Sequence, residues 1–410
     1  MSLLSLRRPR RTVWSVPYCV HYLALHSTNM YTIASPDPFV NPRPIFLPDI
    51  WVLLTIPAGL WYLDFAVSLR EVPMANAYVT FLLGDGRYLP GALLFAYGLR
   101  SQGTAADILC IVSESLPPEA RESLLVLYDD AVVIDPVHIP HRLGQQRQDL
   151  PHIFTRFNCL LLGHDGPYHK AYDKVAVADS DILPLARYDT LFDVDTPAGC
   201  INEKKEYCME YDEAGRYVIP EGYYATGEWN WHERYACCPH GAPIPRELTD
   251  RVAGDVTNMG VNGALYVLSP SAAEFRSIME DISAPEIQER LNAYRWPDMQ
   301  YLTLRYSGIW RNLDIKYASF HAYPEISCLY GIHYAGLNPW NLRHKSIACY
   351  GRYEDYKLWY AAYLTMMERY PSLQKNKRLS KLKKNIEELT SDSRYRFQNV
   401  YLQNVAHLLK

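Results

Sequence analysis

The segment Lys174–Leu183 reads Lys-Val-Ala-Val-Ala-Asp-Ser-Asp-Ile-Leu and decides the fold of this chain. Its short apolar run, typical of a parallel strand buried on both faces, ends at two carboxylates, Asp179 and Asp181. Open α/β sheets bind ligands at the carboxyl ends of such strands. Both side chains can reach one divalent cation, Mn²⁺ or Mg²⁺, which would neutralise a diphosphate. By themselves the three residues also fit an Asp-rich turn that follows a strand.

Alternating strand and helix patterns precede this segment. Strands are expected over 77–83, 107–112 and 131–135, and helices over 89–101, 117–128 and 153–162. Strands and helices that alternate over short links predict a doubly wound α/β sheet. The turn Gly84-Asp85-Gly86 lacks the GxGxxG pattern, which argues against a dinucleotide site there.

The composition is that of a globular protein with a sizeable core. The chain has 410 residues, 49% of them hydrophobic and 21% charged, enough for one large or two moderate domains. Its net charge of −4 argues against nucleic acid as a partner, because coating nucleic acid needs a broadly basic surface. Nine cysteines without a CxxC pair indicate reduced thiols, and no N-x-S/T sequon occurs. These features predict a cytoplasmic protein.

Residues 1–73 differ from the rest. They begin with an arginine cluster and end in an apolar run over 50–63, which Pro57 and Gly59 interrupt. The run falls short of the roughly 20 apolar residues that a membrane-spanning helix needs. We expect an accessory or poorly ordered leader, with the globular pattern beginning at Met74. A membrane anchor through residues 50–69 is the alternative, so membrane association stays open.

Further segments combine with Asp179-Ser180-Asp181. They are Asn76–Leu82 (NAYVTFL), Phe154–Leu160 (FTRFNCL), Val261–Leu268 (VNGALYVL) and Ile332–Trp340 (IHYAGLNPW). Together they resemble glycosyltransferase family 8, the family of glycogenin and plant galactinol synthase, and the second is similar to members from large DNA viruses. The resemblance covers residues 75 to about 345. It implies a GT-A fold with a mixed, mainly parallel sheet flanked by helices, a nucleotide-sugar donor, a Mn²⁺-dependent site and retention of configuration.

The resemblance implies metal ligands and donor contacts. Asp179 and Asp181 match the metal-binding D-x-D motif, and His333, otherwise a candidate packed histidine, matches a third ligand. Two carboxylates and an imidazole suit Mn²⁺, with Mg²⁺ possible. Positions that match donor-binding residues are Thr80, Tyr88, Arg156, Ser180, Gly336 and Asn338. Relatives often have Lys at the last of these, on the leaving diphosphate, where Asn offers a hydrogen bond but no charge.

The resemblance also implies three catalytic positions. Asn262 would lie beside the transferred sugar, and Gln300 near its reacting face. The residue before Gln300 is often an acid in the family, but here it is Met299 and the acid, Asp298, comes one position earlier. Asp298 therefore fits either that catalytic role or a structural one near a helix N-terminus.

Three parts are expected: the leader 1–73, a GT-A domain over 74–348, and a helical extension over 349–410. Within the domain, residues 202–256 form a long insertion rich in Tyr, Trp and Cys. It fits an acceptor-binding element, since sugars stack on aromatic rings, or a surface excursion without a role. In the extension a helix over 353–370 precedes a basic run, which fits a solvated helix face or a surface for a membrane or an acidic partner.

These interpretations predict a retaining, metal-dependent glycosyltransferase. It would move a hexose, glucose or galactose, from a UDP-sugar to a hydroxyl group of a sugar, polyol or protein, and a homodimer stays open. A catalytically weak or inactive sugar-nucleotide-binding relative is the main alternative, because of Met299 and Asn338. A haloacid-dehalogenase-type phosphatase also uses D-x-D but expects Thr or Val where this chain has Leu183.

Overall fold

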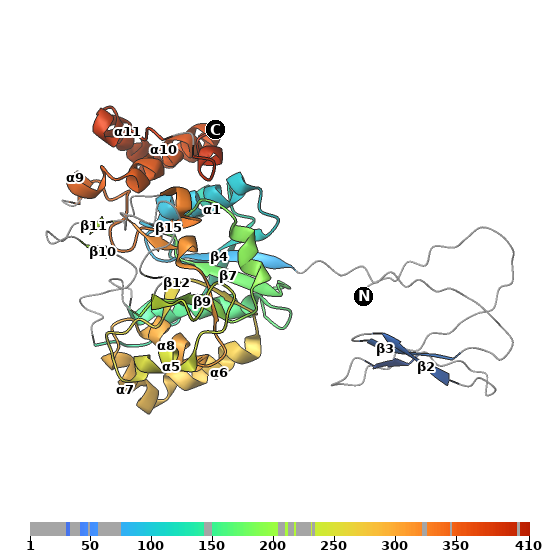
Figure 1. The fold of residues 1–410 in the computed structure, drawn as a ribbon. Helices are drawn as coiled ribbons and strands as arrows, with labels where there is room; N and C mark the ends of the chain where they lie inside the picture. Colours follow the sequence, from blue (N-terminus) through green and yellow to red (C-terminus); the bar gives the residue numbers. More distant parts are fainter. Residues whose placement is uncertain are drawn as a thin grey trace, which may run out of the picture. The chain divides into compact units, whose positions relative to one another are not determined.

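The computed structural model describes residues 75–142, 150–203, 231, 234–321, 326–344, 347–399 and 402–410, and otherwise the backbone of short strands. The chain divides into two compact units, Met1–Val72 and Pro73–Lys410 (Figure 1). The first contains a small sheet of β1 (Met30–Thr32), β3 (Ile50–Thr55) and β2 (Pro42–Leu47), in that order. The rest of the expected leader, and of the alternative anchor over 50–69, lies outside the described residues.

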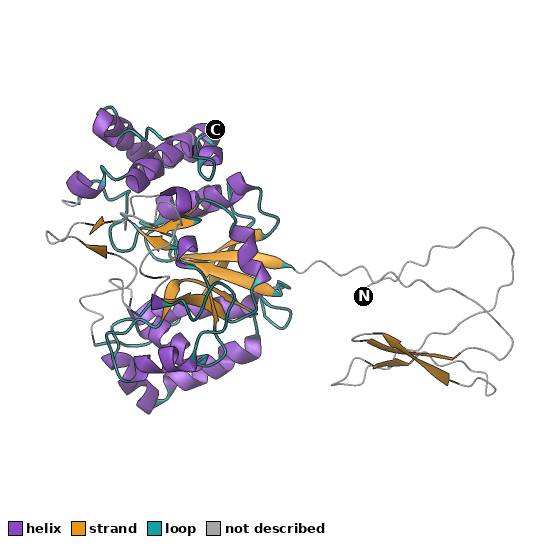
Figure 2. Cartoon of the chain, in the orientation of Figure 1, coloured by secondary structure: helices purple, strands orange, loops and turns teal. Residues whose placement is uncertain are grey.

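A seven-stranded sheet forms the centre of the second unit (Figure 2). Its strands, in spatial order, are β13 (Arg311–Asn312), β9 (Ala198–Ile201), β12 (Val261–Leu268), β7 (Lys174–Ala178), β4 (Asn76–Leu82), β5 (Asp107–Ser113) and β6 (Asp130–Ile134). β12 runs antiparallel to both of its neighbours, and every other neighbouring pair is parallel. The expected mixed, mainly parallel sheet is therefore confirmed.

Helices cover both faces of this sheet, because its strands are apolar on both sides. All eight residues of β12 are buried. α1 (Leu89–Gln102) lies on one side of the sheet, and α6 (Ala272–Ser283), α7 (Pro285–Ala293) and α8 (Pro297–Arg305) lie on the other (Figure 1). The remaining elements before the extension are α2 (Pro118–Leu124), η1 (Leu150–Leu162), η2 (Tyr188–Asp193), β10 (Glu210–Tyr211), β11 (Tyr217–Val218), α5 (Arg246–Asp250), η4 (Arg251–Ala253), η5 (Ile315–Tyr317) and η6 (Ile326–Cys328).

Two expected helices differ in detail from the observed ones. The pattern over 117–128 predicted a longer helix than α2, which ends at Leu124. The chain then turns inward, and the Tyr128 hydroxyl donates to the Ala92 carbonyl over 2.6 Å. The expected helix over 153–162 is η1, which has the tighter 3₁₀ geometry.

A second, three-stranded sheet follows the D-x-D segment. Its order is β14 (Ser319–Phe320), β15 (Gly331–His333) and β8 (Ile182–Pro184). Next comes α9 (Ile347–Tyr350), which begins two residues before the expected extension. The C-terminal extension then contains α10 (Glu354–Arg369), η7 (Pro371–Lys375), α11 (Lys377–Thr390), η8 (Ser393–Tyr395) and η9 (Ala406–Leu408). The extension belongs to the same compact unit as the seven-stranded sheet and the sheet of β14, β15 and β8. Among the described residues, no helix has both the length and the apolar character needed to cross a bilayer.

The basic run of the extension lies on α11. Lys383 and Lys384 form ion pairs with Glu387 and Glu388, each one helical turn further along. Such pairs are typical of a solvated helix face. The apolar residues of the helix, Leu379, Leu382 and Ile386, are buried on its opposite side.

Candidate active site

The D-x-D segment is the corner at which the chain leaves one sheet for the other. Asp179 directly follows β7, and its backbone N–H donates to the Ala264 carbonyl of β12 over 2.8 Å. Asp181 directly precedes β8. β8 pairs antiparallel with β15, so that Ile182 lies opposite His333. This ladder places Asp181 next to His333, although about 150 residues separate them in the sequence.

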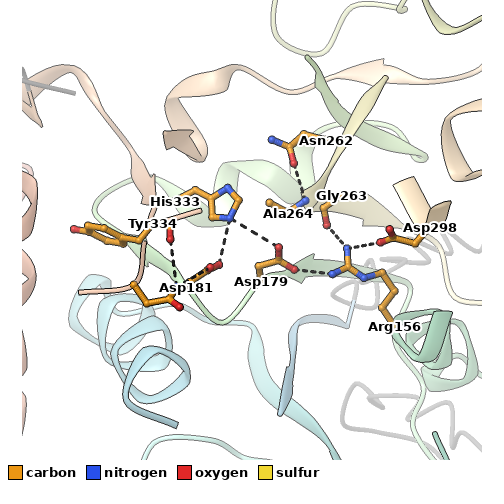
Figure 3. A network of polar contacts seen from close by, with 10 residues as sticks. Arg156, Asp179, Asp181, Asn262, Gly263, Ala264, Asp298, His333 and Tyr334 are labelled. Carbon is orange, nitrogen blue, oxygen red and sulfur yellow. Dashed lines mark hydrogen bonds and ion pairs between the residues drawn. The ribbon is translucent and has the colours of Figure 1, made fainter. Parts of the chain in front are cut away.

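Asp179, Asp181 and His333 converge on one point (Figure 3). One ligand atom from each lies within 4.8 Å of the others. Nε2 of His333 is 3.3 Å from Oδ1 of Asp181 and 3.9 Å from Oδ2 of Asp179. The structure therefore brings together the three residues that the sequence motifs assigned to the metal.

The residues fit a divalent cation. Oδ1 of Asp181 is buried and has no hydrogen-bond partner among the described residues, an arrangement that is costly unless another group binds it. Desolvation, assisted by Asp181, raises the pKa of Asp179 to about 6, even though Arg156 lowers it. Two carboxylates held together with an imidazole are a donor set that Mn²⁺ accepts. A bound cation would relieve the repulsion between the two carboxylates.

Arg156 links Asp179 to Asp298 (Figure 3). Nη2 donates to Oδ1 of Asp179 over 2.8 Å, while Nη1 lies 3.1 Å from Oδ2 of Asp298 and donates to the Gly263 carbonyl over 2.6 Å. Burial lowers the pKa of Arg156, but the two carboxylates raise it by a larger amount. The net shift is upward, so the guanidinium stays charged. Gly263 permits this approach, since a Cβ there would lie 3.0 Å from Nη1. The sequence predicted that Arg156 contacts the donor. In the structure its guanidinium pairs with Asp179 and Asp298.

Asp298 lies in the first turn of α8 with 2% of its surface exposed. Its Oδ1 is buried without a hydrogen-bond partner among the described residues, and Oδ2 faces Arg156. The N-cap residue of this helix is Trp296, whose side chain makes no cap hydrogen bond. Asp298 is thus linked to the cluster of Asp179, Asp181 and His333 by Arg156, which pairs with both Asp298 and Asp179.

Gln300 and Asn262 make local contacts. The Gln300 side chain is fully buried, accepts from the Trp296 N–H over 2.8 Å and donates to the Val256 carbonyl over 3.0 Å. It therefore joins the start of α8 to the loop before β12. Oδ1 of Asn262 accepts from the Ala264 N–H over 2.9 Å, where the pairing of β12 with β9 shifts register. Asn262 thus shapes the irregularity in β12 that presents the Gly263 carbonyl to Arg156.

The other donor candidates surround the corner. Thr80 is fully buried in β4, and its hydroxyl has no hydrogen-bond partner within the described chain. Tyr88, 37% exposed, packs edge-on against Trp340 at 5.5 Å between ring centroids. The Ser180 carbonyl lies against α1, where a Cβ on Gly91 would come within 2.3 Å of it. Gly336 has a φ of +77°, which favours glycine, and a Cβ there would meet no atom within 4 Å. Its backbone therefore borders open space, three residues after His333.

Asn338 contacts a metal-ligand candidate directly. Its Nδ2 donates to Oδ2 of Asp181 over 3.1 Å and to the Tyr334 carbonyl over 3.3 Å. The sequence predicted that Asn338 contacts a diphosphate. It did not predict the hydrogen bond from Asn338 to Asp181. The motif gave no sign of it, because it depends on how the loop after β15 folds back. The amide fixes the orientation of the Asp181 carboxylate and leaves Oδ1 for a cation.

Known proteins similar to this chain include a viral protein and two kinds of enzyme. No protein-family model matches the chain. Uncharacterized protein R707 of Acanthamoeba polyphaga mimivirus is 25% identical over 280 residues, covering 65% of this chain and 82% of that protein. Galactinol synthase 7 of Arabidopsis thaliana is 29% identical over 133 residues, 32% of this chain and 38% of that one. Glycogenin-1 of Caenorhabditis elegans is 30% identical over 122 residues, 29% of this chain and 27% of that one.

The chain thus spans most of the viral protein and less than half of the plant and nematode enzymes. The plant and nematode matches are to the two kinds of enzyme that the motifs indicated. The viral match agrees with the similarity noted for Phe154–Leu160. The chain is therefore similar to galactinol synthases and glycogenins, which confirms the resemblance to glycosyltransferase family 8.

Proposed function

We propose that the chain is a metal-dependent, retaining glycosyltransferase that moves glucose or galactose from a UDP-sugar to a hydroxyl group. The observation that supports it most is the cluster of Asp179, Asp181 and His333, whose ligand atoms lie within 4.8 Å of one another. Mn²⁺, or Mg²⁺, held by these residues would supply the Lewis acid that stabilises a leaving diphosphate. The open backbone at Gly336 gives the diphosphate a route of approach.

The surrounding residues have separate parts in this proposal. Arg156 holds Oδ1 of Asp179, which leaves Oδ2 directed to the cluster. To Asp298, which is paired with the same guanidinium, we assign the role of the acid that the family often has at position 299. Asn262 supports the strand segment next to it, and Gln300 anchors the adjoining loop. The insertion over 202–256, partly outside the described residues, stays our candidate for binding the sugar, polyol or protein acceptor.

The test is UDP release from UDP-glucose and UDP-galactose, with Mn²⁺ and after chelation by EDTA. The wild-type protein should release UDP only with the metal, and Asp181→Asn should reduce the rate at least a hundredfold. Asp195→Asn is the matched control, because that carboxylate is 79% exposed and lies outside the cluster. Turnover by Asp181→Asn at the wild-type rate would contradict the metal assignment.

A second candidate function is sugar-nucleotide binding with little or no turnover. The observation in its favour is Asn338, which offers no charge to a leaving diphosphate and whose amide already binds Asp181. Isothermal titration of UDP together with the release assay separates the two proposals. Metal-dependent UDP binding without release from any UDP-sugar would support the second, whereas release would support transfer.

A further inference from the structure

The segment 326–340 carries His333, contributes β15 to the sheet of β14, β15 and β8, and contacts the C-terminal extension. On the sheet side it is held by few residues, since β15 has three residues and β14 has two. Beyond β15 the chain continues through the left-handed Gly336 to Pro339 without joining another strand. Short ladders of this kind stabilise a loop only weakly. The ladder that places His333 next to Asp181 is therefore short, and contacts from elsewhere add to it.

The extension supplies those contacts before and after His333. Nδ2 of Asn404 donates to the Ile326 carbonyl over 2.7 Å and to the Leu329 carbonyl over 3.2 Å, just ahead of β15. The residue after His333 is Tyr334, whose hydroxyl donates to the Asp355 carbonyl over 2.7 Å at the start of α10. These bonds fix the segment on both sides of β15.

Two aromatic residues of α10 hold the rest of the segment. The Tyr356 hydroxyl donates to the Leu337 carbonyl over 2.7 Å, and its ring packs edge-on against Tyr334 at 5.3 Å. Trp359 packs against Trp340 at 5.6 Å between centroids. Tyr356 and Trp359 are each at most 1% exposed, so water does not compete for these contacts. The extension thus forms a buried support directly behind the residues from His333 to Trp340.

We propose that the C-terminal extension is part of the metal site, with Tyr356 and Asn404 as positioning residues that hold His333 in register with Asp179 and Asp181. The inference rests on the proposed metal dependence. It goes further, because it assigns the extension a role in binding the ion. The hydroxyl of Tyr356 is the most direct contact to test, since its acceptor, Leu337, lies next to Asn338.

The chain offers a matched control for this test. Tyr356 and Tyr363 are both fully buried tyrosines of α10, and each hydroxyl donates to one backbone carbonyl. The acceptor for Tyr363 is Leu379 of α11, which lies inside the extension. Tyr356→Phe and Tyr363→Phe therefore each remove one buried hydrogen bond to a carbonyl, of 2.7 Å and 3.2 Å, and only the first bond reaches the segment that carries His333.

Mn²⁺ titration followed by electron paramagnetic resonance should show a roughly fivefold rise in the dissociation constant for Tyr356→Phe, as expected for one lost hydrogen bond. Tyr363→Phe should bind within twofold of wild type while losing similar thermal stability. Equal Mn²⁺ affinities for the two variants would overturn the inference. Asn404→Ala provides a second variant if Tyr356→Phe does not fold, and it should weaken Mn²⁺ binding in the same direction.

Hydrogen exchange in EDTA-treated protein tests the positioning without metal. Backbone amides of 331–340 should exchange faster in Tyr356→Phe than in Tyr363→Phe. If wild type binds no Mn²⁺, the proposed metal dependence fails, and exchange still decides whether the extension holds the segment. If wild type binds Mn²⁺ and exchange over 331–340 is the same in both variants, the positioning role is wrong and the proposed function is untouched.

Discussion

Asp179 lies between opposing charges. Arg156 favours its ionised form, while desolvation and the neighbouring Asp181 disfavour it and prevail, which raises its pKa to about 6. The carboxylate that a cation needs is thus present above about pH 6 and is lost as the pH falls through that value. A proton would therefore compete with a bound metal ion for this one side chain.

We expect the Mn²⁺ dissociation constant to rise about tenfold between pH 7 and pH 5, because a group with a pKa of about 6 is mostly protonated at the lower pH. Isothermal titration at constant ionic strength measures it. A flat profile would show that Asp179 does not bind the ion through its carboxylate. In EDTA at pH 7.5, Asp179→Asn should melt no lower than wild type, since a neutral side chain avoids the repulsion from Asp181.

For Asn338→Lys, the structure and the resemblance to the family predict opposite effects on ligand binding. A lysine there would be expected to bind the diphosphate, but the structure places the side chain against Asp181. The ammonium of Asn338→Lys would pair with that carboxylate and repel the cation, so Mn²⁺ binding should weaken roughly tenfold or more. Asn341→Lys adds the same charge at an exposed position of the same loop and should change the affinity little. Tighter UDP binding by Asn338→Lys would show that residue 338 reaches the phosphates.

At the scale of elements, α1 supports the D-x-D corner through a glycine. A Cβ at Gly91 would come within 2.3 Å of the Ser180 carbonyl and 2.5 Å of the Trp340 ring. Two segments that flank the candidate site thus meet on one residue of this helix. At Gly98, two turns further along, a Cβ would come within 2.6 Å of the Pro184 carbonyl oxygen.

Gly91→Ala should lower the unfolding free energy by about 1–3 kcal/mol, as overpacking does, and should also weaken Mn²⁺ binding by displacing Ser180. Gly98→Ala should cost similar stability with unchanged Mn²⁺ affinity, because its neighbour lies past the corner. Thermal melts in EDTA and Mn²⁺ titrations measure the two effects separately. Equal affinities in the two variants would mean that α1 does not position the corner.

How far the sequence predicts these elements depends on the range of the contacts involved. The strand that ends at Asp179 follows from a local apolar run and two acids. The position of His333 does not, since it requires β8 to pair with β15, and only the resemblance to family 8 indicated it. The partners of Gln300 are backbone atoms of Trp296 and Val256, which no side-chain pattern encodes.

At the scale of the whole molecule, sheet class and helical extension were predicted, but the attachment of the extension was not. Its polar contacts run mainly from side chains to carbonyl groups, as for Tyr97, which donates to the Leu408 carbonyl over 3.0 Å. A carbonyl is present at every residue, so the sequence does not show which one is used. The apolar periodicity of α10 predicts that one face of the helix is buried, but it does not show which segment that face packs against.

The second unit should fold without the first. Its first described ties are at Ala75, whose N–H donates to Oδ2 of Asp173 over 2.9 Å and whose carbonyl accepts from the Asp173 N–H over 2.7 Å. A chain beginning at Met74 keeps these and should bind Mn²⁺ as the full chain does, with its main melting transition within about 2 °C. A chain beginning at Thr80 loses the pairing of β4 with β7 and should not fold. Unfolding of the first shortened chain, judged by circular dichroism, would show that residues before Met74 belong to the core.

The corner at Asp179–Asp181 has a consequence for the durability of the protein. An ion bound there would join the two sheets through side chains, at a point where the backbone also passes from one sheet to the other. By mass action, Mn²⁺ at a hundred times its dissociation constant would stabilise the folded state by about 2.7 kcal/mol. Starvation for the metal would then loosen the three-stranded sheet from its neighbour and expose the chain after His333 to proteases. The supply of the ion would then affect how fast the protein is degraded in the cell, in addition to how fast it works as a catalyst.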